Sequence, residues 1–213
     1  MLSDDTAGAS LFLDLLRELE SIGAPYIVIG GFAATMYGST RTTYDIDLVV
    51  DLQEEHVEAL VAHYPPPRYY ADPEQIRESV RLGISFNIVD SERGEKADLT
   101  PLTPDSPYAP AFRRRVRQAI TWPGMAPLDV WCACPDDVIL GKLLAWDEGR
   151  SRKHESDIYD MLVFHYLGAD PALDLIFDEA YLDGQSRSLG PEVAQLWDSV
   201  KRAARRDAQR ASV

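Results

Sequence analysis

The sequence predicts an α/β (α+β) protein in which helices flank a small mixed β-sheet and a helical bundle follows. Up to residue 134, short apolar runs of strand length alternate with amphipathic patterns of helical spacing. From residue 135 on, every periodic segment has helical spacing. We therefore expect an α/β domain over residues 1–134 and a helical domain over 135–213. No Gly/Ser-rich linker separates them, so we expect the two to pack together.

The first elements follow from apolar spacing and from glycines. Residues 11–23 carry leucines at helical spacing and end in a glycine, which is typical of a helix with a glycine C-cap. Residues 25–31 form a short apolar run that two glycines end, so we expect a buried strand. A brief helix is expected over 32–38, and a second strand over 42–51.

Prolines and glycines delimit the next elements. A helix is predicted over 53–64, and the three prolines that follow end it. Another helix over 73–83 begins with proline and ends with glycine. Two apolar runs, 84–90 and 96–102, are predicted strands on either side of a turn-like segment.

A helix and a strand complete the first domain, and helices alone make up the second. The helical pattern covers 108–120, and residues 126–134 are the last predicted strand. The helices expected after it cover residues 135–146, 154–167, 171–182 and 190–210.

Composition and charge exclude several classes of protein. No apolar run approaches the roughly 20 residues that span a bilayer, and the first residues lack the pattern of a secretory signal. We therefore expect no membrane association. The two cysteines, Cys132 and Cys134, are poorly placed to bond each other or to bind zinc, so we expect a reducing cytoplasm. A net charge of −14 argues against indiscriminate binding to nucleic acid.

Two aspartates, Asp45 and Asp47, stand two apart inside a predicted strand. Residues two apart share a face of a strand, so both carboxylates project together while Ile46 and Leu48 face the core. The carboxylates repel each other unless a positive group lies between them, and magnesium is a hard ion that accepts carboxylate oxygens. The alternative is that one aspartate caps a turn and the other binds a surface arginine such as Arg41.

Two further features raise the case for a metal and a phosphate. Gly30 and Gly31 lie between a strand and a short helix, where backbone N–H groups can approach a phosphate, although such a pair is often only a tight turn. Asp98 lies on a later strand and offers a third carboxylate. Three carboxylates suit a pair of metal ions about 3.5–4 Å apart in phosphoryl transfer. Alternatively, Asp98 belongs to a turn before a proline.

These features lie in strings that carry a family resemblance. The sequence resembles the nucleotidyltransferase-fold (polymerase-β-like) superfamily, and more closely its AbiEii-type branch, which includes the toxin components of type IV toxin–antitoxin systems. The similarity spans roughly residues 26–162. The strings that carry it are GGFAATMYGSTRTTYDIDLVV, EKADLTP, CPDDVILGKLLAW and SDIYDML.

The resemblance implies a role for each matching residue. Gly30 and Gly31 would hold the triphosphate of an NTP. Asp45 and Asp47 would bind Mg²⁺ or Mn²⁺, with Asp98 as the third carboxylate that helps to deprotonate the acceptor hydroxyl.

Further matching residues would complete the nucleotide site. Lys142 would reach the phosphates, Asp157 would complete the pocket, and Arg41 would contact phosphate or brace the carboxylates. Gly31 stands where the wider superfamily usually has serine, and Ser39 is a candidate replacement for its hydroxyl. Read without the resemblance, Lys142 is a lysine whose stem lies along an amphipathic helix, and Asp157 belongs to a charged helix start.

The implied activity is metal-dependent transfer of a nucleoside monophosphate from an NTP to an acceptor hydroxyl. In the resembling branch a frequent acceptor is the 3′ end of tRNA, and a cognate antitoxin is a further expected partner. An arginine run would hold the RNA phosphates, unless it is only a solvated helix face. The alternatives are an antibiotic nucleotidyltransferase and a non-catalytic nucleotide-binding antitoxin or partner protein. The run comprises Arg113, Arg114, Arg115 and Arg117, and the basic residues of 201–210 are the other candidate.

Overall fold

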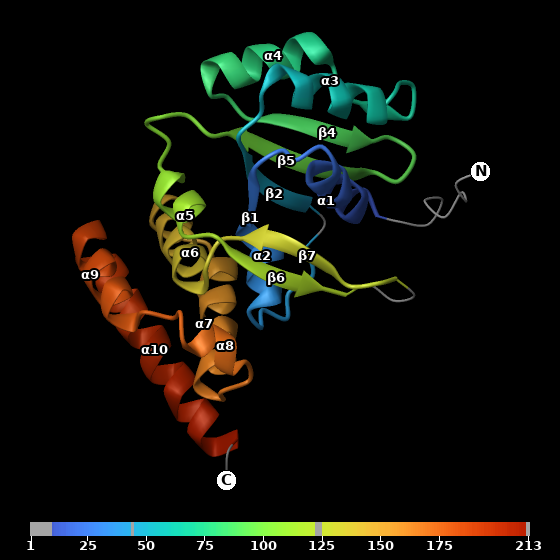
Figure 1. The fold of residues 1–213 in the computed structure, drawn as a ribbon. Coiled ribbons are helices and arrows are strands. Elements are labelled where there is room, and N and C mark those ends of the chain that lie inside the picture. The colour runs from blue at the N-terminus through green and yellow to red at the C-terminus, as the bar shows by residue number, and fades with distance from the viewer. Residues whose placement is uncertain (1–9, 44, 122–124, 212–213) are drawn as a thin grey trace. The chain divides into compact units, whose positions relative to one another are not determined.

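The computed structural model describes residues 10–43, 45–121 and 125–211 (Figure 1). Within them the chain forms ten helices and seven strands, and this mixture of helices and a mixed sheet confirms the predicted fold class. In chain order they are α1 (Leu11–Ser21), β1 (Tyr26–Ile29), α2 (Gly30–Met36), β2 (Asp45–Val50), α3 (Glu54–His63), β3 (Tyr69–Tyr70), α4 (Pro73–Leu82), β4 (Phe86–Asp90), β5 (Glu95–Pro101), α5 (Ala109–Arg113), β6 (Val116–Ile120), β7 (Leu128–Cys132), α6 (Pro135–Gly149), α7 (Arg152–Tyr166), α8 (Pro171–Asp174), α9 (Glu179–Leu189) and α10 (Pro191–Ala211).

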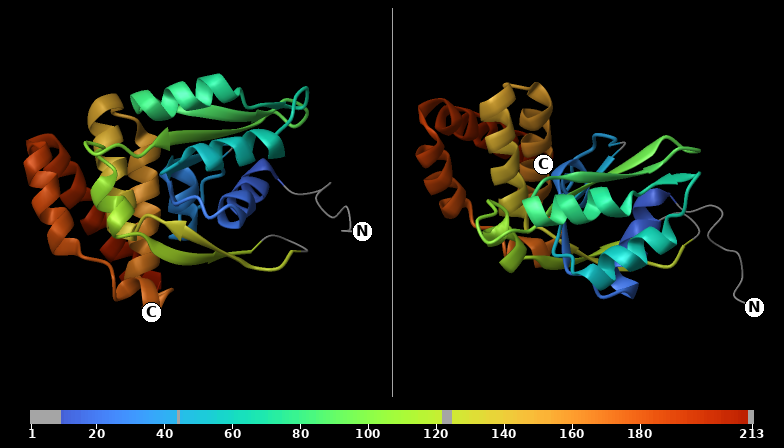
Figure 2. Two further views of the ribbon diagram at one scale, coloured as in Figure 1. Left: turned by 45° about the horizontal axis from the view of Figure 1, so that its top comes forward. Right: turned by 90° about the horizontal axis from the view of Figure 1, so that it is seen from above.

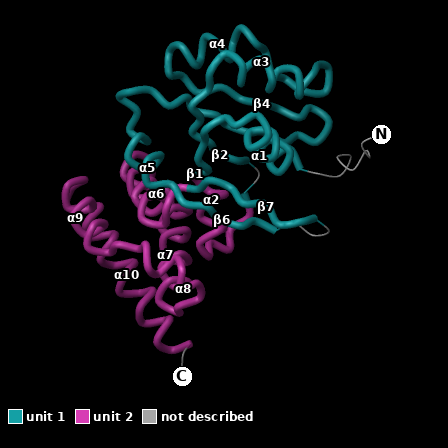
Figure 3. Tube along the Cα trace, in the orientation of Figure 1, with its two compact units in different colours: residues 1–29, 43–132 teal, residues 30–42, 133–213 magenta. Residues whose placement is uncertain are grey.

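Contacts divide the chain into two compact units (Figure 3). Unit 1 contains residues 1–29 and 43–132, and unit 2 contains residues 30–42 and 133–213. The segment 30–42 connects β1 to β2 in the chain but has its contacts with the helices of unit 2. This division describes contacts, and the domain boundary predicted after residue 134 stays a prediction.

Unit 1 holds the whole sheet, in the order β3-β4-β5-β2-β1-β7-β6. The central strand β2 pairs antiparallel with β1 and parallel with β5, while β4 pairs antiparallel with β5. Ile46 and Leu48 on β2 and Ala97 and Leu99 on β5 are fully buried on one side of the sheet. The helices α1 and α4 contact β5 and β4, so this apolar side of the sheet forms the core of unit 1.

The helix α4 of unit 1 begins and ends where its local chemistry predicts. The Asp72 carboxylate accepts a hydrogen bond from the Gln75 N–H at 2.7 Å, and Pro73 occupies the first turn of α4. Gly83 then ends α4 with a φ of +67°, a conformation that suits glycine. A Cβ at Gly83 would also overlap the Thr103 side chain.

Unit 2 is built around long helices. The helices α6 and α7 lie side by side, and α10 contacts α6, α7 and α9 (Figure 2). The side of α10 that faces these helices buries Val193, Trp197, Ala204 and Ala208. Ala204 and Ala208 are small and lie one turn apart, and Trp197 is the largest buried side chain of the helix.

Two predicted helices are wrong in part. The helix expected over 108–120 ends at Arg113, and Val116–Ile120 is the edge strand β6, paired antiparallel with β7. Pairing with β7 favours the extended form for the alternating residues of this segment, against the helical propensity of the arginine run. The helix expected over 171–182 splits into α8 and α9. Here Asp178 caps a new helix, because its carboxylate accepts from the Tyr181 N–H at 2.9 Å.

Candidate functional site

Three carboxylates and one ammonium share a face of the unit 1 sheet, and we call these four residues the carboxylate face. Asp45 and Asp47 are the first and third residues of β2, so they project to the same side. In the parallel pairing of β2 with β5, Asp47 lies opposite Asp98, and Asp45 lies opposite Lys96. Residues in register on adjacent strands share a face, so all four side chains belong to one side of the sheet.

The core on the other side of the sheet fixes this orientation. Ile46 and Leu48 alternate with the two aspartates and are fully buried, as is Leu99, which follows Asp98. A shift of register by one residue would bury the carboxylates and expose the core residues. The hydrophobic pattern therefore forces the acidic residues onto the open side.

Two side chains contact the carboxylates of this face, one a cation and one a hydroxyl. The Lys96 Nζ lies 2.7 Å from the Asp98 Oδ2. The hydrogen bond with Asp98 raises the pKa of Lys96, and the nearby charges of Asp45 and Asp47 raise it further. The Thr43 hydroxyl donates to the Asp45 Oδ1 at 2.7 Å. Among the four residues of this face, one ammonium thus stands against three carboxylates.

The donor type of this face fits a hard divalent cation, which prefers carboxylate oxygens. In the conformation seen here, however, the described part of the chain gathers no group of three or more acidic, histidine or cysteine side chains closely enough to hold an ion. The Asp98 carboxylate is instead turned to Lys96. The ligand set Asp45, Asp47 and Asp98 stays a prediction.

A second group of ionised side chains lies in unit 2, and we call Ser39, Arg41, Lys142 and Asp157 the Asp157 cluster. Asp157 on α7 is fully buried and receives three side chains. The Lys142 Nζ on α6 donates to its Oδ2 at 2.7 Å, and the Ser39 hydroxyl donates to its Oδ1 at 3.0 Å. The Arg41 Nε and Nη2 donate to the two oxygens at 3.1 and 3.2 Å.

The electrostatics of the Asp157 cluster keep its carboxylate ionised. Burial raises the pKa of Asp157, but the hydrogen bonds from Arg41 and Lys142 outweigh this and hold the pKa below its ordinary value. The Lys142 side chain is only 6% exposed, whereas that of Arg41 is 38% exposed. Arg41 therefore presents part of its guanidinium to solvent while the rest is fixed by the bidentate contact.

The segment that carries Ser39 and Arg41 is fixed to the helices by two more contacts. Gly38 has a φ of +98°, and a Cβ there would overlap the Phe164 side chain on α7. The Thr40 hydroxyl and backbone N–H both donate to the Asp160 Oδ2, at 2.8 and 3.0 Å. A glycine is required at Gly38 because backbone and helix approach so closely.

The glycine pair lies at the start of α2, within the helix and not before it. Gly30 has a φ of +70°, which a residue with a side chain adopts only with strain. It follows Ile29, the last residue of β1, whose partner in the sheet is Asp47. Gly30 is thus one peptide bond away from a residue paired with the carboxylate face.

The structure therefore groups the predicted site residues in two sets. Asp45, Asp47 and Asp98 share a face in unit 1, while Ser39, Arg41, Lys142 and Asp157 form one hydrogen-bonded cluster in unit 2. The sequence interpretation missed Lys96. The alternation of the string KADLTP places that lysine on the same side as Asp98, which is the signal that identifies it.

The arginine run has two kinds of members. Arg117 forms a bidentate contact with Glu20 at 2.5 and 2.9 Å, and its guanidinium lies 4.4 Å from the centre of the Trp131 ring system. Arg115 lies between Phe112 and Trp131, at 4.6 and 4.7 Å from their ring centres. Arg113 and Arg114 are exposed, as is Arg117, whose guanidinium is held by Glu20.

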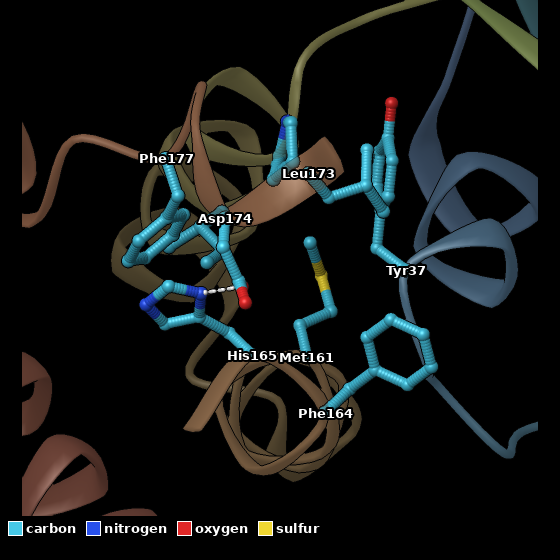
Figure 4. Close-up of a pocket in the computed structure, with 9 residues that line it drawn as sticks. Tyr37, Met161, Phe164, His165, Leu173, Asp174 and Phe177 are labelled. Carbon is cyan, nitrogen blue, oxygen red and sulfur yellow. Dashed lines mark hydrogen bonds and ion pairs between the residues drawn. The ribbon is translucent and has the colours of Figure 1, made fainter. Parts of the chain in front are cut away.

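A small pocket lies within unit 2, apart from the predicted site residues (Figure 4). Its lining is mostly apolar and includes Tyr37, Met161 and Phe164. The polar residues in it, His165 and Asp174, contact each other, with the His165 Nδ1 2.5 Å from the Asp174 Oδ1. The pocket is thus lined by packing residues and one internal pair.

None of the helices in the described ranges combines the length and the apolar character that crossing a bilayer requires. Both cysteines are free and buried, and burial raises the pKa of the Cys134 thiol to about 12.

Comparison with known proteins identifies a family. A family model described as the nucleotidyl transferase AbiEii toxin of a type IV TA system matches residues 14–210. No curated protein matches the chain.

Several solved structures are similar over most of their length. JHP933 from Helicobacter pylori is 13% identical, with a TM-score of 0.43 over 95% of this chain and 92% of that one. A nucleotidyltransferase-like antigenic protein from Paracoccidioides brasiliensis is 18% identical, with a TM-score of 0.44 over 87% and 89%. The complex of ANT(2″)-Ia with adenylyl-2″-tobramycin is also 18% identical, with a TM-score of 0.44 over 82% and 96%.

Proposed function

The chain belongs to the AbiEii nucleotidyltransferase toxin family, and we propose that it moves a nucleoside monophosphate from an NTP to the 3′ end of a tRNA. The single observation that carries the chemistry is the carboxylate face. Asp45 and Asp47 share one side of β2, and Asp98 lies in register with Asp47 on β5. Like charges on adjacent positions of one sheet face repel one another, and a bound cation relieves that repulsion.

We propose that Asp45, Asp47 and Asp98 hold Mg²⁺ or Mn²⁺. Their oxygens are the ligands that such ions prefer, and the shared face of β2 and β5 supports the assignment. When bound, the ion would draw the nucleotide phosphates to the carboxylates and lower the charge that opposes attack.

The reaction uses Asp98 as the proton acceptor. The acceptor hydroxyl oxygen forms a bond to the α-phosphorus, and the bond from that phosphorus to the oxygen bridging the β-phosphate breaks. The hydroxyl proton passes to the Asp98 carboxylate, and pyrophosphate leaves with the bonding electrons. Asp98 is suited to this role because it is 27% exposed and accessible to an acceptor.

We propose further that Gly30, Gly31, Ser39, Arg41 and Lys142 contact the nucleotide. The glycines leave the backbone N–H groups at the start of α2 open to a phosphate. Arg41 is the more accessible of the two cations on Asp157, so it is the more direct phosphate contact. Asp157 completes the group because it orients both cations.

The tRNA acceptor is supported by the toxin description of the family and by the exposed Arg113 and Arg114. Because the chain carries a net charge of −14, a local basic patch is the arrangement that RNA phosphates require. A cognate antitoxin and a cytoplasmic location are parts of the same proposal.

A labelling experiment tests the transfer. The protein is incubated with each α-labelled NTP, Mg²⁺ or Mn²⁺, and total RNA, protein extract, an aminoglycoside or a lincosamide. We expect label in the tRNA fraction, and none with an Asp45→Asn/Asp47→Asn variant of unchanged melting temperature. Label in a drug or protein fraction alone would overturn the tRNA acceptor. No label in any fraction would overturn the transfer, and NTP-dependent thermal stabilisation would then indicate a nucleotide-binding partner protein.

A charge reversal tests the RNA contact. In Arg113→Glu/Arg114→Glu we expect tRNA labelling to fall and to lose part of its salt dependence, with thermal stabilisation by NTP unchanged. The matched control is Arg152→Glu/Arg187→Glu, which makes the same charge change at exposed positions of α7 and α9. An equal loss in both variants would show a general charge effect and contradict the contact.

A further inference from the structure

The carboxylate face contains one residue that the proposed function leaves without a role. Lys96 is two residues before Asp98 on β5 and lies opposite Asp45 on β2. Its ammonium is therefore placed among three carboxylates and contacts one of them, Asp98, at 2.7 Å. Its positive charge offsets part of the negative charge that a divalent cation would otherwise neutralise.

The contact between Lys96 and Asp98 is exposed enough for another cation to replace the ammonium. The Lys96 side chain is 45% exposed, and that of Asp98 is 27% exposed. Ion pairs of this exposure contribute little to stability, because water and salt compete with them. The lysine also has a long flexible stem, so its ammonium can leave the carboxylate without displacing the strand.

A cation and the ammonium cannot both occupy the same carboxylate oxygen. The Lys96 ammonium contacts the Oδ2 of Asp98, so a cation that binds this oxygen has to displace the ammonium from it. The released ammonium then needs another anion. A nucleotide triphosphate supplies anionic oxygens at the moment when the cation takes the carboxylate.

We propose that Lys96 is an internal counter-ion that competes with the divalent cation for Asp98 and passes to a phosphate of the bound NTP. This inference rests on the proposed function, since it requires that the carboxylate face binds a cation. It makes two predictions of opposite sign. Loss of the ammonium strengthens cation binding without nucleotide, and it weakens nucleotide binding when the cation is present.

Manganese is the probe for the prediction on cation binding, because the concentration of free Mn²⁺ can be measured by electron paramagnetic resonance. The full chain is titrated with Mn²⁺ as wild type, Lys96→Met and Lys96→Arg. We expect Lys96→Met to bind Mn²⁺ roughly tenfold more tightly, since one nearby positive charge is removed at a partly exposed site. Lys96→Arg keeps the charge and should stay within about threefold of wild type.

The control separates this from the effect of net charge. Lys153→Met removes one positive charge at an exposed position of α7 in unit 2 and should leave the Mn²⁺ affinity unchanged. If Lys153→Met strengthens binding as much as Lys96→Met, or if Lys96→Met changes nothing, the inference is wrong. If the wild type itself binds no Mn²⁺, the proposed metal site fails first. These outcomes are distinct.

The prediction on nucleotide binding is tested with a non-hydrolysable NTP analogue in saturating Mn²⁺. We expect the analogue to bind Lys96→Met several-fold more weakly than wild type, and Lys96→Arg with nearly wild-type affinity. Unchanged or tighter binding to Lys96→Met would overturn the transfer of the ammonium to phosphate. Circular dichroism and melting temperature establish that each variant is folded before the titrations are compared.

Discussion

The carboxylate face and the Asp157 cluster both bring ionised side chains together, but they balance their charges in opposite ways. On the carboxylate face, three acidic residues share one ammonium and remain partly exposed. In the Asp157 cluster, a single fully buried carboxylate has two cations and a hydroxyl as partners. The first is acidic and open, whereas in the second the carboxylate is buried and paired while Arg41 stays 38% exposed.

This difference predicts that the two groups contribute to different properties, one to stability and the other to binding. A buried charge without partners is strongly unfavourable, so the Asp157 cluster must be complete for the helices and the segment 30–42 to fold as seen. Repulsion on an open face costs less and is relieved when a cation binds. We therefore expect changes in the Asp157 cluster to act first on stability, and changes on the carboxylate face to act first on binding and transfer.

The largest effect should come from Asp157→Ala. It leaves Lys142 and part of Arg41 without their carboxylate, so the free energy of unfolding should fall by about 3–5 kcal/mol. Asp98→Ala, on the open face, should stay within about 0.5 kcal/mol of wild type. Urea unfolding at pH 7 measures both. Similar values for the two variants would remove the distinction, and Asp157→Asn serves if the alanine variant does not fold.

A smaller effect is expected from Lys142→Met. Asp157 keeps Arg41 and Ser39, so only one charge-assisted hydrogen bond is lost, worth about 1.5–3 kcal/mol. Lys153→Met is the matched control and should leave stability unchanged. Label transfer is then measured at a temperature where the variant is folded. Loss of transfer there supports the phosphate contact of Lys142, whereas full transfer shows that this lysine acts only on stability.

The smallest effect is a change in the acid dependence of stability. Because the folded-state pKa of Asp157 lies below its ordinary value, its contribution is complete above the unfolded pKa, near 4, and is lost as the pH falls through the folded pKa. One group changes the slope by at most about 1.4 kcal/mol per pH unit. Other carboxylates with a lowered pKa, such as Asp90 and Asp183, weaken both proteins as the pH falls. The loss of stability from pH 7 to 2 should therefore be smaller in Asp157→Asn than in wild type. Parallel curves would contradict it.

The face on which each residue of β2 lies could be predicted from the sequence, because the alternation that determines it is local. The alternation in DIDLVV places Asp45 and Asp47 on one face, and the fully buried Ile46 and Leu48 on the other face agree with that pattern. The register of β2 with β5, which sets Asp47 beside Asp98, depends on pairing between distant segments and could not be derived from either string alone.

The Asp157 cluster shows the opposite limit. Lys142 and Asp157 were singled out through a resemblance, but their direct contact links residues 15 apart in sequence, and the one between Arg41 and Asp157 links residues 116 apart. The strand β6 was missed for the same reason, because its extended form depends on pairing with β7. Local propensity favours a helix there, and tertiary contacts override it.

The route of the chain through segment 30–42 limits how the molecule can be shortened. The backbone leaves unit 1 after Ile29, runs through residues that belong to unit 2, and returns at Thr43 before β2 (Figure 3). A truncation after residue 132 would remove α6 and α7 and leave Ser39 and Arg41 in the fragment without Asp157. Neither unit is a continuous segment of the chain. A fragment designed to contain one complete unit must therefore include both of its segments, joined by a new connection.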